Sequence, residues 1–233
     1  MVMAGRVEEG FALLEDQAAS IPTGGMGAGL RWPGSDQATR ATRAATAIQV
    51  GEPERAADLV EELEAATGFG DDARVVLGML ALQRGDLAGA AGPLAVRDDD
   101  ATNPNLVSAQ ALYAAAAGTG DAGALADRVT GLLGATYLDR ALAEVAAGLE
   151  AAQAGHGTDA ADRIARARSL VAPTGDVLAR AVVELAGAEV AQRTGHPDAP
   201  HQRVEADRRF ANLGLDPAGW VRIMALTASA VPA

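Results

Sequence analysis

A glycine recurs at a nearly constant interval along most of the chain, and this interval limits the fold more than any other feature. In the regular copies the glycine is followed by an acidic residue or histidine and then by alanine-rich sequence. These copies begin at Gly51, Gly85, Gly120 and Gly155, so their spacings are 34, 35 and 35 residues. Looser copies at Gly5 and Gly195 lie 46 residues before this series and 40 residues after it. The interval predicts a repeated unit of two helices joined by a turn.

The residues of each copy fit a helix end followed by a helix start. Glycine adopts the left-handed conformation that closes many helices, and aspartate or a first-turn proline suits the start of the next helix. Apolar residues then recur every three or four positions, which predicts one buried helix face. Helices before the turns are expected at about 37–50, 72–84, 105–118, 138–154 and 177–194. Their partners after the turns are expected at about 53–66, 86–96, 121–133, 157–171 and 199–213.

The composition favours helices over strands. Alanine accounts for 56 of the 233 residues, whereas Trp, Tyr and Phe together account for seven. Alanine has the highest helix propensity, and sheets depend on β-branched and aromatic side chains that this chain has in small number. The sequence therefore predicts an all-α fold. Because alanine buries little area, the core must depend on helices that lie close together.

The repeat resembles the tetratricopeptide repeat. The copy with most matching positions consists of Leu77, Gly78, Gly85, Leu87, Ala90 and Leu94. A second match consists of Gly148, Gly155, Ala160, Ile164 and Ala167. Other copies depart from the family pattern, since Leu125 stands where a small residue is expected, so related helical-hairpin repeats remain an alternative. The bias toward Ala, Arg and Gly also resembles the repeat regions of actinobacterial regulators.

This resemblance implies a right-handed α-solenoid of antiparallel helix hairpins with a C-terminal capping helix. The expected organisation has an unpaired N-terminal helix in 1–20, a loop rich in Gly and Pro in 21–36, five hairpins in 37–215, and the capping helix and tail in 216–233. The unpaired helix has an apolar stripe that either the helix at 37–50 or an upstream domain or second protomer must cover.

The expected capping helix has a clear start. Asp216 is suited to the N-cap, and Pro217 to the first turn. Trp220, Ile223 and Met224 follow at helical spacing and form one apolar face, which would seal the last hairpin. The opposite side also carries apolar residues, so a homodimer through the terminal helices is an alternative.

Charge and signal patterns exclude several classes of protein. The net charge of −12 argues against direct binding to nucleic acid, because proteins that bind it depend on clusters of basic residues. The first ten residues contain two acids where a secretory signal is basic and then apolar, and the longest apolar runs, 75–82 and 109–117, are too short to cross a membrane. We therefore expect a cytoplasmic protein without membrane contact. The absence of cysteine excludes disulfides.

The sequence predicts no catalytic residue, no cofactor and no metal site. His156 and His196 occupy the same place after a repeat glycine, so they are expected to be turn residues. His196 and His201 lack the spacing of a zinc site, and the acidic run at 98–100 lacks the glycine and glutamate of a calcium loop.

Two functions follow from the repeat. The first is a non-enzymatic scaffold that binds an apolar or amphipathic protein segment in the concave groove, where solenoids present the first helix of each hairpin. The second is a regulatory or ligand-sensing region associated with a larger signalling protein, such as a transcription regulator, ATPase or nucleotide cyclase. The residues expected to line the groove are Val75, Met79, Leu82, Gln83, Gln110, Val145, Leu149, Gln153, Leu185, Glu189 and Gln192.

Overall fold

The computed structural model describes residues 9–10, 12–13, 35–50, 53–54, 56, 70–97 and 102–229 of the chain. This described part contains ten complete α-helices and no strand, which confirms the prediction of an all-α fold. Most of the helix expected at 53–66, most of the loop expected at 21–36, most of the N-terminal helix and the tail after 229 lie outside the described residues.

The helix boundaries agree closely with those expected from the sequence. The first helices of the pairs are α2 (Ser35–Val50), α4 (Asp71–Arg84), α6 (Pro104–Ala117), α8 (Tyr137–Gln153) and α10 (Val177–Arg193). The second helices are α5 (Leu87–Leu94), α7 (Ala122–Gly131), α9 (Gly157–Val171) and α11 (Ala199–Asn212). The last helix is α12 (Ala218–Ser229). One difference lies at the start of α2, which includes Ser35 and Asp36, two residues that were expected in the loop.

Three of the repeat glycines close their helices in the same way. Gly85, Gly155 and Gly195 have φ angles of 80°, 79° and 71°, which residues with a Cβ rarely adopt. In each turn the amide after the glycine donates to a carbonyl five residues earlier, as Asp86 does to Ala81 over 2.9 Å. This pattern is the Schellman motif, which satisfies carbonyls left open at a helix end.

The turn between α6 and α7 has the same hydrogen bond, but around a glycine that is out of register with the repeat. Here Gly118 is the left-handed residue that directly follows the helix, and Thr119 donates its amide to Ala114. Gly120, the glycine in register with the repeat, also has a positive φ but lies two residues further on. Asp121 makes no side-chain cap bond, and the carboxylate of Glu150 in α8 accepts the first amides of α7 instead.

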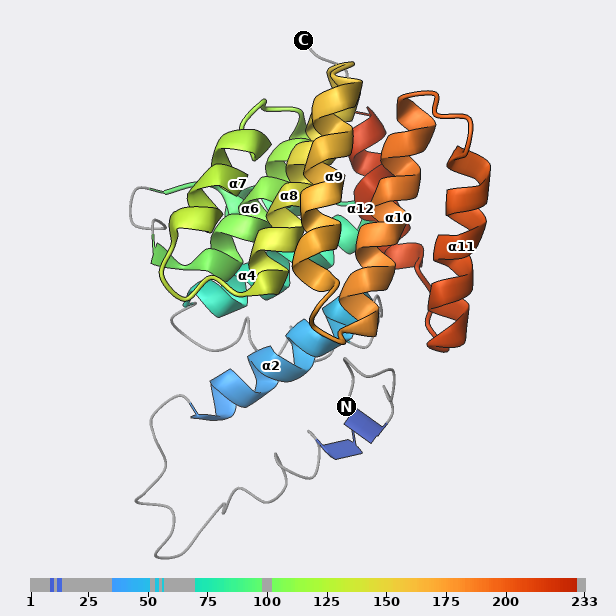
Figure 1. The fold of residues 1–233 in the computed structure, drawn as a ribbon. Coiled ribbons are helices and arrows are strands. Elements are labelled where there is room, and N and C mark those ends of the chain that lie inside the picture. The colour runs from blue at the N-terminus through green and yellow to red at the C-terminus, as the bar shows by residue number, and fades with distance from the viewer. Residues whose placement is uncertain are drawn as a thin grey trace, which may run out of the picture.

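The helices form layers (Figure 1). Consecutive first helices lie next to each other in the order α2, α4, α6, α8 and α10. The second helices pack on one side of this layer, with α5 against α4 and α6, α7 against α6 and α8, and α9 against α8 and α10. We call the opposite surface of α4, α6, α8 and α10 the inner face.

The C-terminal helix lies on the inner face. It contacts α4, α6, α8 and α10, so it crosses the first helices of four pairs (Figure 1). The sequence led us to expect a cap over the last pair, and the structure corrects this position. The apolar residues of α12 are those expected, since Trp220, Ile223 and Met224 are all buried. They are buried against the helix layer, where α12 contacts α4, α6, α8 and α10.

Small residues let the helices of a pair approach closely. A Cβ on Gly78 in α4 would lie 2.2 Å from Cγ of Leu94 in α5, and one on Gly148 in α8 would lie 3.3 Å from the backbone oxygen of Ala160 in α9. Both glycines belong to the family pattern identified in the sequence. The core is otherwise built largely from Ala, Val and Leu side chains of the first helices.

Candidate functional site

Side chains of α12 close the C-terminal ends of two other helices. The indole Nε1 of Trp220 donates to the carbonyl oxygen of Gln49 at the end of α2, over 3.0 Å. The guanidinium of Arg222 donates to the carbonyl of Gln83 near the end of α4. The last carbonyls of a helix have no partner within the helix, so these donors satisfy groups that would otherwise need water. The bond between Trp220 and Gln49 thus joins the first complete helix to the last, and we call it the clasp.

An apolar groove lies on the inner face beside the clasp. Its larger pocket has an empty volume of about 490 Å³ and its smaller pocket about 290 Å³, and both volumes include part of the open solvent outside the protein. The two pockets share a wall formed by Gln49, Leu138, Leu142 and Trp220. The larger pocket is also lined by Ala45, Ile48, Val75, Val76, Met79, Asn105, Ser108, Ala109 and Leu112. The smaller pocket is also lined by Asp176, Leu178, Ala179 and Val182.

Helix geometry explains why this part of the inner face stays open. Most lining residues of α4, α6, α8 and α10 come from the first halves of those helices, and Met79 and Leu112 lie just past the midpoints of α4 and α6. Contacts of α12 such as those to Gln83 and Arg193 involve the last turns of α4 and α10. The C-terminal helix therefore covers one half of the inner face and leaves the groove over the other half.

The lining contains few polar side chains, and Asp176 is the one acidic residue among them. Ser108 donates its hydroxyl to the backbone oxygen of Asn105 over 2.9 Å. Asp176 is buried and caps α10, because its Oδ1 accepts the amide of Ala179 over 2.9 Å. A surface of this composition suits apolar ligands with a small number of hydrogen-bonding groups.

Tyr137 supports the carboxylate of Asp176 at the edge of the smaller pocket. Its hydroxyl donates to Oδ2 of Asp176 over 2.8 Å. Partial burial, together with the hydrogen bond and negative charge of Asp176, raises the pKa of Tyr137 to about 12. The phenol therefore stays protonated and remains a donor at physiological pH.

The structure brings two of the eleven predicted groove residues to this surface, Val75 and Met79. The other nine border neither pocket. Six of these nine are buried between helices, Gln153 and Glu189 are half-buried, and Gln192 is exposed. Gln83 is held by the end of α2, where its Nε2 donates to the carbonyl of Ile48 over 2.6 Å. Gln110 donates to Ala95, which follows α5, so this amide points away from the inner face.

Sequence reasoning missed most of the residues that form the groove. Leu138 and Leu142 are four residues apart in α8 and both line the shared wall. Their spacing marked an apolar helix face, but nothing in the sequence separated this stripe from the core. Gln49 and Trp220 were missed because they come from opposite ends of the chain.

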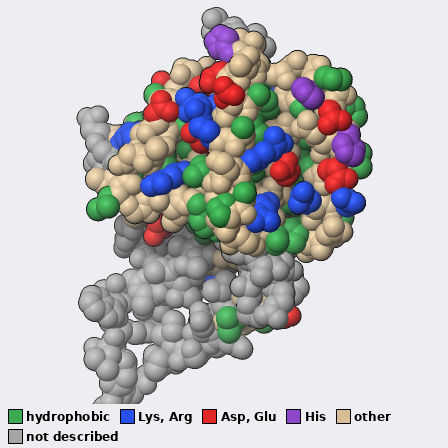
Figure 2. All heavy atoms as spheres, viewed as in Figure 1, with side chains coloured by type: hydrophobic (Ala, Val, Ile, Leu, Met, Phe, Trp, Pro, Cys, Tyr) green, Lys and Arg blue, Asp and Glu red, His purple; other side chains and the backbone are tan. Residues whose placement is uncertain are grey.

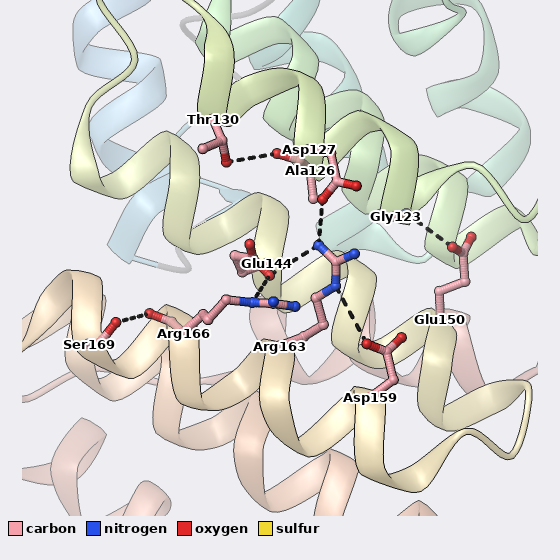
Figure 3. Close-up of polar contacts among 10 residues, drawn as sticks. All are labelled: Gly123, Ala126, Asp127, Thr130, Glu144, Glu150, Asp159, Arg163, Arg166 and Ser169. Atoms are coloured by element: carbon pink, nitrogen blue, oxygen red, sulfur yellow. Dashed lines mark hydrogen bonds and ion pairs between the residues drawn. The ribbon is translucent and has the colours of Figure 1, made fainter.

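A charge network stabilises the opposite side of the molecule. Nη1 of Arg163 in α9 donates to Asp127 in α7 over 2.9 Å and to Glu144 in α8 over 3.3 Å, and Arg166 also donates to Glu144 (Figure 3). Hydrogen bonds and the charges of Asp127 and Glu144 raise the pKa of Arg163 against the opposing effect of burial. Figure 2 shows arginine and acidic side chains interspersed over this face. The network joins three helices, α7, α8 and α9.

The two histidines expected in turns have that position. His156 and His196 directly follow the left-handed glycines Gly155 and Gly195, and Nδ1 of His196 accepts the amide of Asp198. In the described part of the chain, no group of three or more acidic or histidine side chains could hold a metal ion. None of the described helices is both long enough and apolar enough to cross a membrane.

Comparison with known proteins finds no relative. No protein-family model, no curated protein sequence and no solved structure matches this chain.

Proposed function

We propose that this chain is a non-enzymatic helical-repeat scaffold that binds an apolar segment of another protein in the groove beside the clasp. In this proposal the helix pairs form a right-handed α-solenoid of the tetratricopeptide type, and the inner face is its concave surface. The resemblance of the repeats and the order of the helix contacts support this interpretation.

The single observation that carries the proposal is the composition of the groove. Its lining is mostly apolar and is drawn from α2, α4, α6, α8, α10 and α12. Leu138 and Leu142 are half-buried, so part of this surface faces solvent. A contiguous apolar surface with a few polar groups is typical of a site for a ligand or partner. Its one ionisable side chain, Asp176, is occupied as a helix cap, which favours binding over catalysis.

A cross-linking experiment followed by titration tests the proposal. A photoreactive amino acid at position 138 should capture a partner in cells, whereas the same residue at position 204, on the outer helix α11, should not. The captured protein is then purified and titrated against wild type, Leu142→Glu and a matched control, Leu133→Glu. Leu133 is 98% exposed and borders neither pocket.

We expect Leu142→Glu to weaken binding at least about tenfold, because it places a charge in an apolar contact. Leu133→Glu should leave the affinity unchanged. Circular dichroism must show that both variants keep the helical content of wild type. Capture from both positions, or equal affinity for the two glutamate variants, would contradict the proposal.

A further inference from the structure

Most side chains that line the groove are buried, although the groove has an open mouth. Asn105 is exposed, and Leu138 and Leu142 are half-buried. Ser108 and Leu112, in contrast, are each only 1% exposed. A partner segment that fills the pockets has to contact such buried side chains. One wall of the groove must therefore move before the pockets are filled.

The wall formed by α2 lies at the end of the helix layer. This helix contributes Ala45, Ile48 and Gln49 to the larger pocket, and Gln49 also lines the smaller pocket together with residues of α8 and α10. Its main packing partner among the described helices is α4, whereas the helices of every other wall pack against several neighbours. Figure 1 shows that α2 runs at a steep angle to α8 and α10. Movement of α2 therefore disturbs less of the described core than movement of any other wall.

Two side-chain donors hold the C-terminal end of α2. Nε1 of Trp220 donates to the carbonyl oxygen of Gln49 over 3.0 Å, and Nε2 of Gln83 donates to that of Ile48 over 2.6 Å. These consecutive carbonyls belong to the last turn of α2, where the helix itself offers no donor. Water can replace such a donor, so the loss of either bond shifts an opening equilibrium by roughly threefold to tenfold.

The closed position of α2 leaves one buried polar atom unsatisfied. Gln83 is 0% exposed, and its Oε1 has no hydrogen-bond partner among the described residues. A buried acceptor without a partner destabilises the state that contains it. Because the other end of this amide bonds to α2, movement of α2 uncovers the amide and lets water satisfy the oxygen. The residue that holds α2 closed therefore also favours its release.

We propose that α2 is the movable wall of the groove, and that release of its C-terminal end from Trp220 and Gln83 admits the partner segment to the pockets. This inference rests on the proposed function, because it states how the groove of that proposal is reached. It gives the clasp a second role as the contact that closes the groove. Gln83, which borders neither pocket, controls access through its bond to Ile48.

Thiol labelling measures this opening without a partner. The chain contains no cysteine, so a single introduced thiol is the only one that reacts. Ser108→Cys places the thiol in the lining of the larger pocket. Val107→Cys is the matched control, because Val107 is 0% exposed on the same helix and borders neither pocket. Each variant reacts with excess dithionitrobenzoate, its rate is divided by the rate in denaturant, and circular dichroism verifies its helical content.

We expect the thiol at position 108 to react at least about tenfold faster than the thiol at position 107, because local opening costs less free energy than global unfolding. Low urea concentrations should accelerate labelling at 107 more than at 108, since movement of α2 exposes less surface than unfolding of the whole chain.

Two further substitutions identify the wall that moves. Gln83→Met removes the donor to Ile48 at nearly constant volume and should raise the rate at position 108 roughly threefold to tenfold. Ile164→Val weakens the core where α9 meets Gly148 of α8, far from the clasp in the helix order. It should raise the rate at position 107 and leave the rate at position 108 unchanged.

Three results would overturn the inference. Equal rates at positions 107 and 108 that respond alike to urea would mean that the pocket opens only when the chain unfolds. A rate at position 108 equal to that of the denatured chain would mean that the groove is open without movement of α2. A fast rate at position 108 that Gln83→Met leaves unchanged would place the entrance at another wall. Each of these results leaves the proposed function standing, because the cross-linking experiment decides separately whether a partner binds.

Discussion

The indole nitrogen of Trp220 lies 3.0 Å from the carbonyl oxygen of Gln49, a residue 171 positions earlier in the chain. This hydrogen bond closes the C-terminal end of α2 with a side chain of α12. The same two residues form part of the wall between the two pockets. The contact that ties the first complete helix to the last therefore also shapes the groove.

Replacement of Trp220 by Phe tests the clasp. The phenyl ring keeps much of the buried apolar volume but cannot donate to Gln49. We expect the free energy of unfolding to fall by about 1–3 kcal/mol, from the lost hydrogen bond and incomplete packing. Urea denaturation measures this change. Hydrogen exchange should also become faster in α2 but not in α9, which has no part in the clasp. Unchanged protection of α2 would show that the bond does not hold this helix in place.

Gly78→Ala and Gly92→Ala form a matched pair that tests close helix packing. A Cβ at position 78 would meet the side chain of Leu94 at 2.2 Å, whereas one at position 92 would meet no atom within 4 Å. Overpacking should lower the free energy of unfolding of Gly78→Ala by about 1–3 kcal/mol. Gly92→Ala should be equal to wild type or more stable by up to about 1 kcal/mol, because alanine favours the helix. Thermal denaturation followed by circular dichroism distinguishes the two, and equal melting temperatures would contradict the contact.

Glu144→Gln tests the charge network. The side chain of Glu144 is 10% exposed and accepts from both Arg163 and Arg166, so loss of its charge weakens two contacts at once. We expect a destabilisation of about 1–3 kcal/mol. Glu205→Gln is the control, because Glu205 pairs with Arg208 within the single helix α11 and should change stability by less than about 1 kcal/mol. Chemical denaturation of both variants provides the comparison, and a larger effect at Glu205 would exclude a structural role for the network.

The pKa of Tyr137 predicts a dependence of stability on alkaline pH. Partial burial and Asp176 raise this pKa to about 12 in the folded chain, whereas an unfolded tyrosine ionises near its ordinary pKa of 10.0. The folded state therefore keeps a proton that the unfolded state loses. The stabilisation is fully present below pH 10 and is lost as the pH rises toward 12.

Ultraviolet titration in a Tyr113→Phe background isolates the phenol of Tyr137, because the chain has two tyrosines. Asp176→Asn should lower the pKa of Tyr137 toward the ordinary value, since it removes the negative charge while asparagine still caps α10. An unchanged pKa in this variant would assign the shift to burial alone.

Local chemistry explains why the helix boundaries could be predicted. Gly85, Gly155 and Gly195 end helices because they adopt a backbone conformation that other residues avoid, and Asp176 starts one because its carboxylate accepts a free amide. These effects act over a few residues. The turn after α6 shows the limit of this reasoning. Gly118 and Gly120 both lie near the end of this helix, and the repeat interval pointed to Gly120, whereas Gly118 is the residue that ends the helix.

Long-range contacts explain why the groove could not be predicted. Trp220 and Arg222 lie one turn from the start of α12, and no local signal indicates that they donate to the ends of α2 and α4. Residues such as Leu149 and Leu185 have the same apolar character as Leu142, yet they are buried between helices while Leu142 lines the groove.

The helices, most of their ends and the close approach at Gly78 and Gly148 follow from the sequence, because glycine conformation, capping and the size of a side chain are properties of single residues and near neighbours. The position of α12 and the half of the inner face that stays open depend on how distant helices pack together. The apolar stripe of α12 could pack on any apolar surface of similar width. The donors Trp220 and Arg222 meet the carbonyls of Gln49 and Gln83 only when helices that are distant in the sequence are in place, and these contacts fix the position of α12.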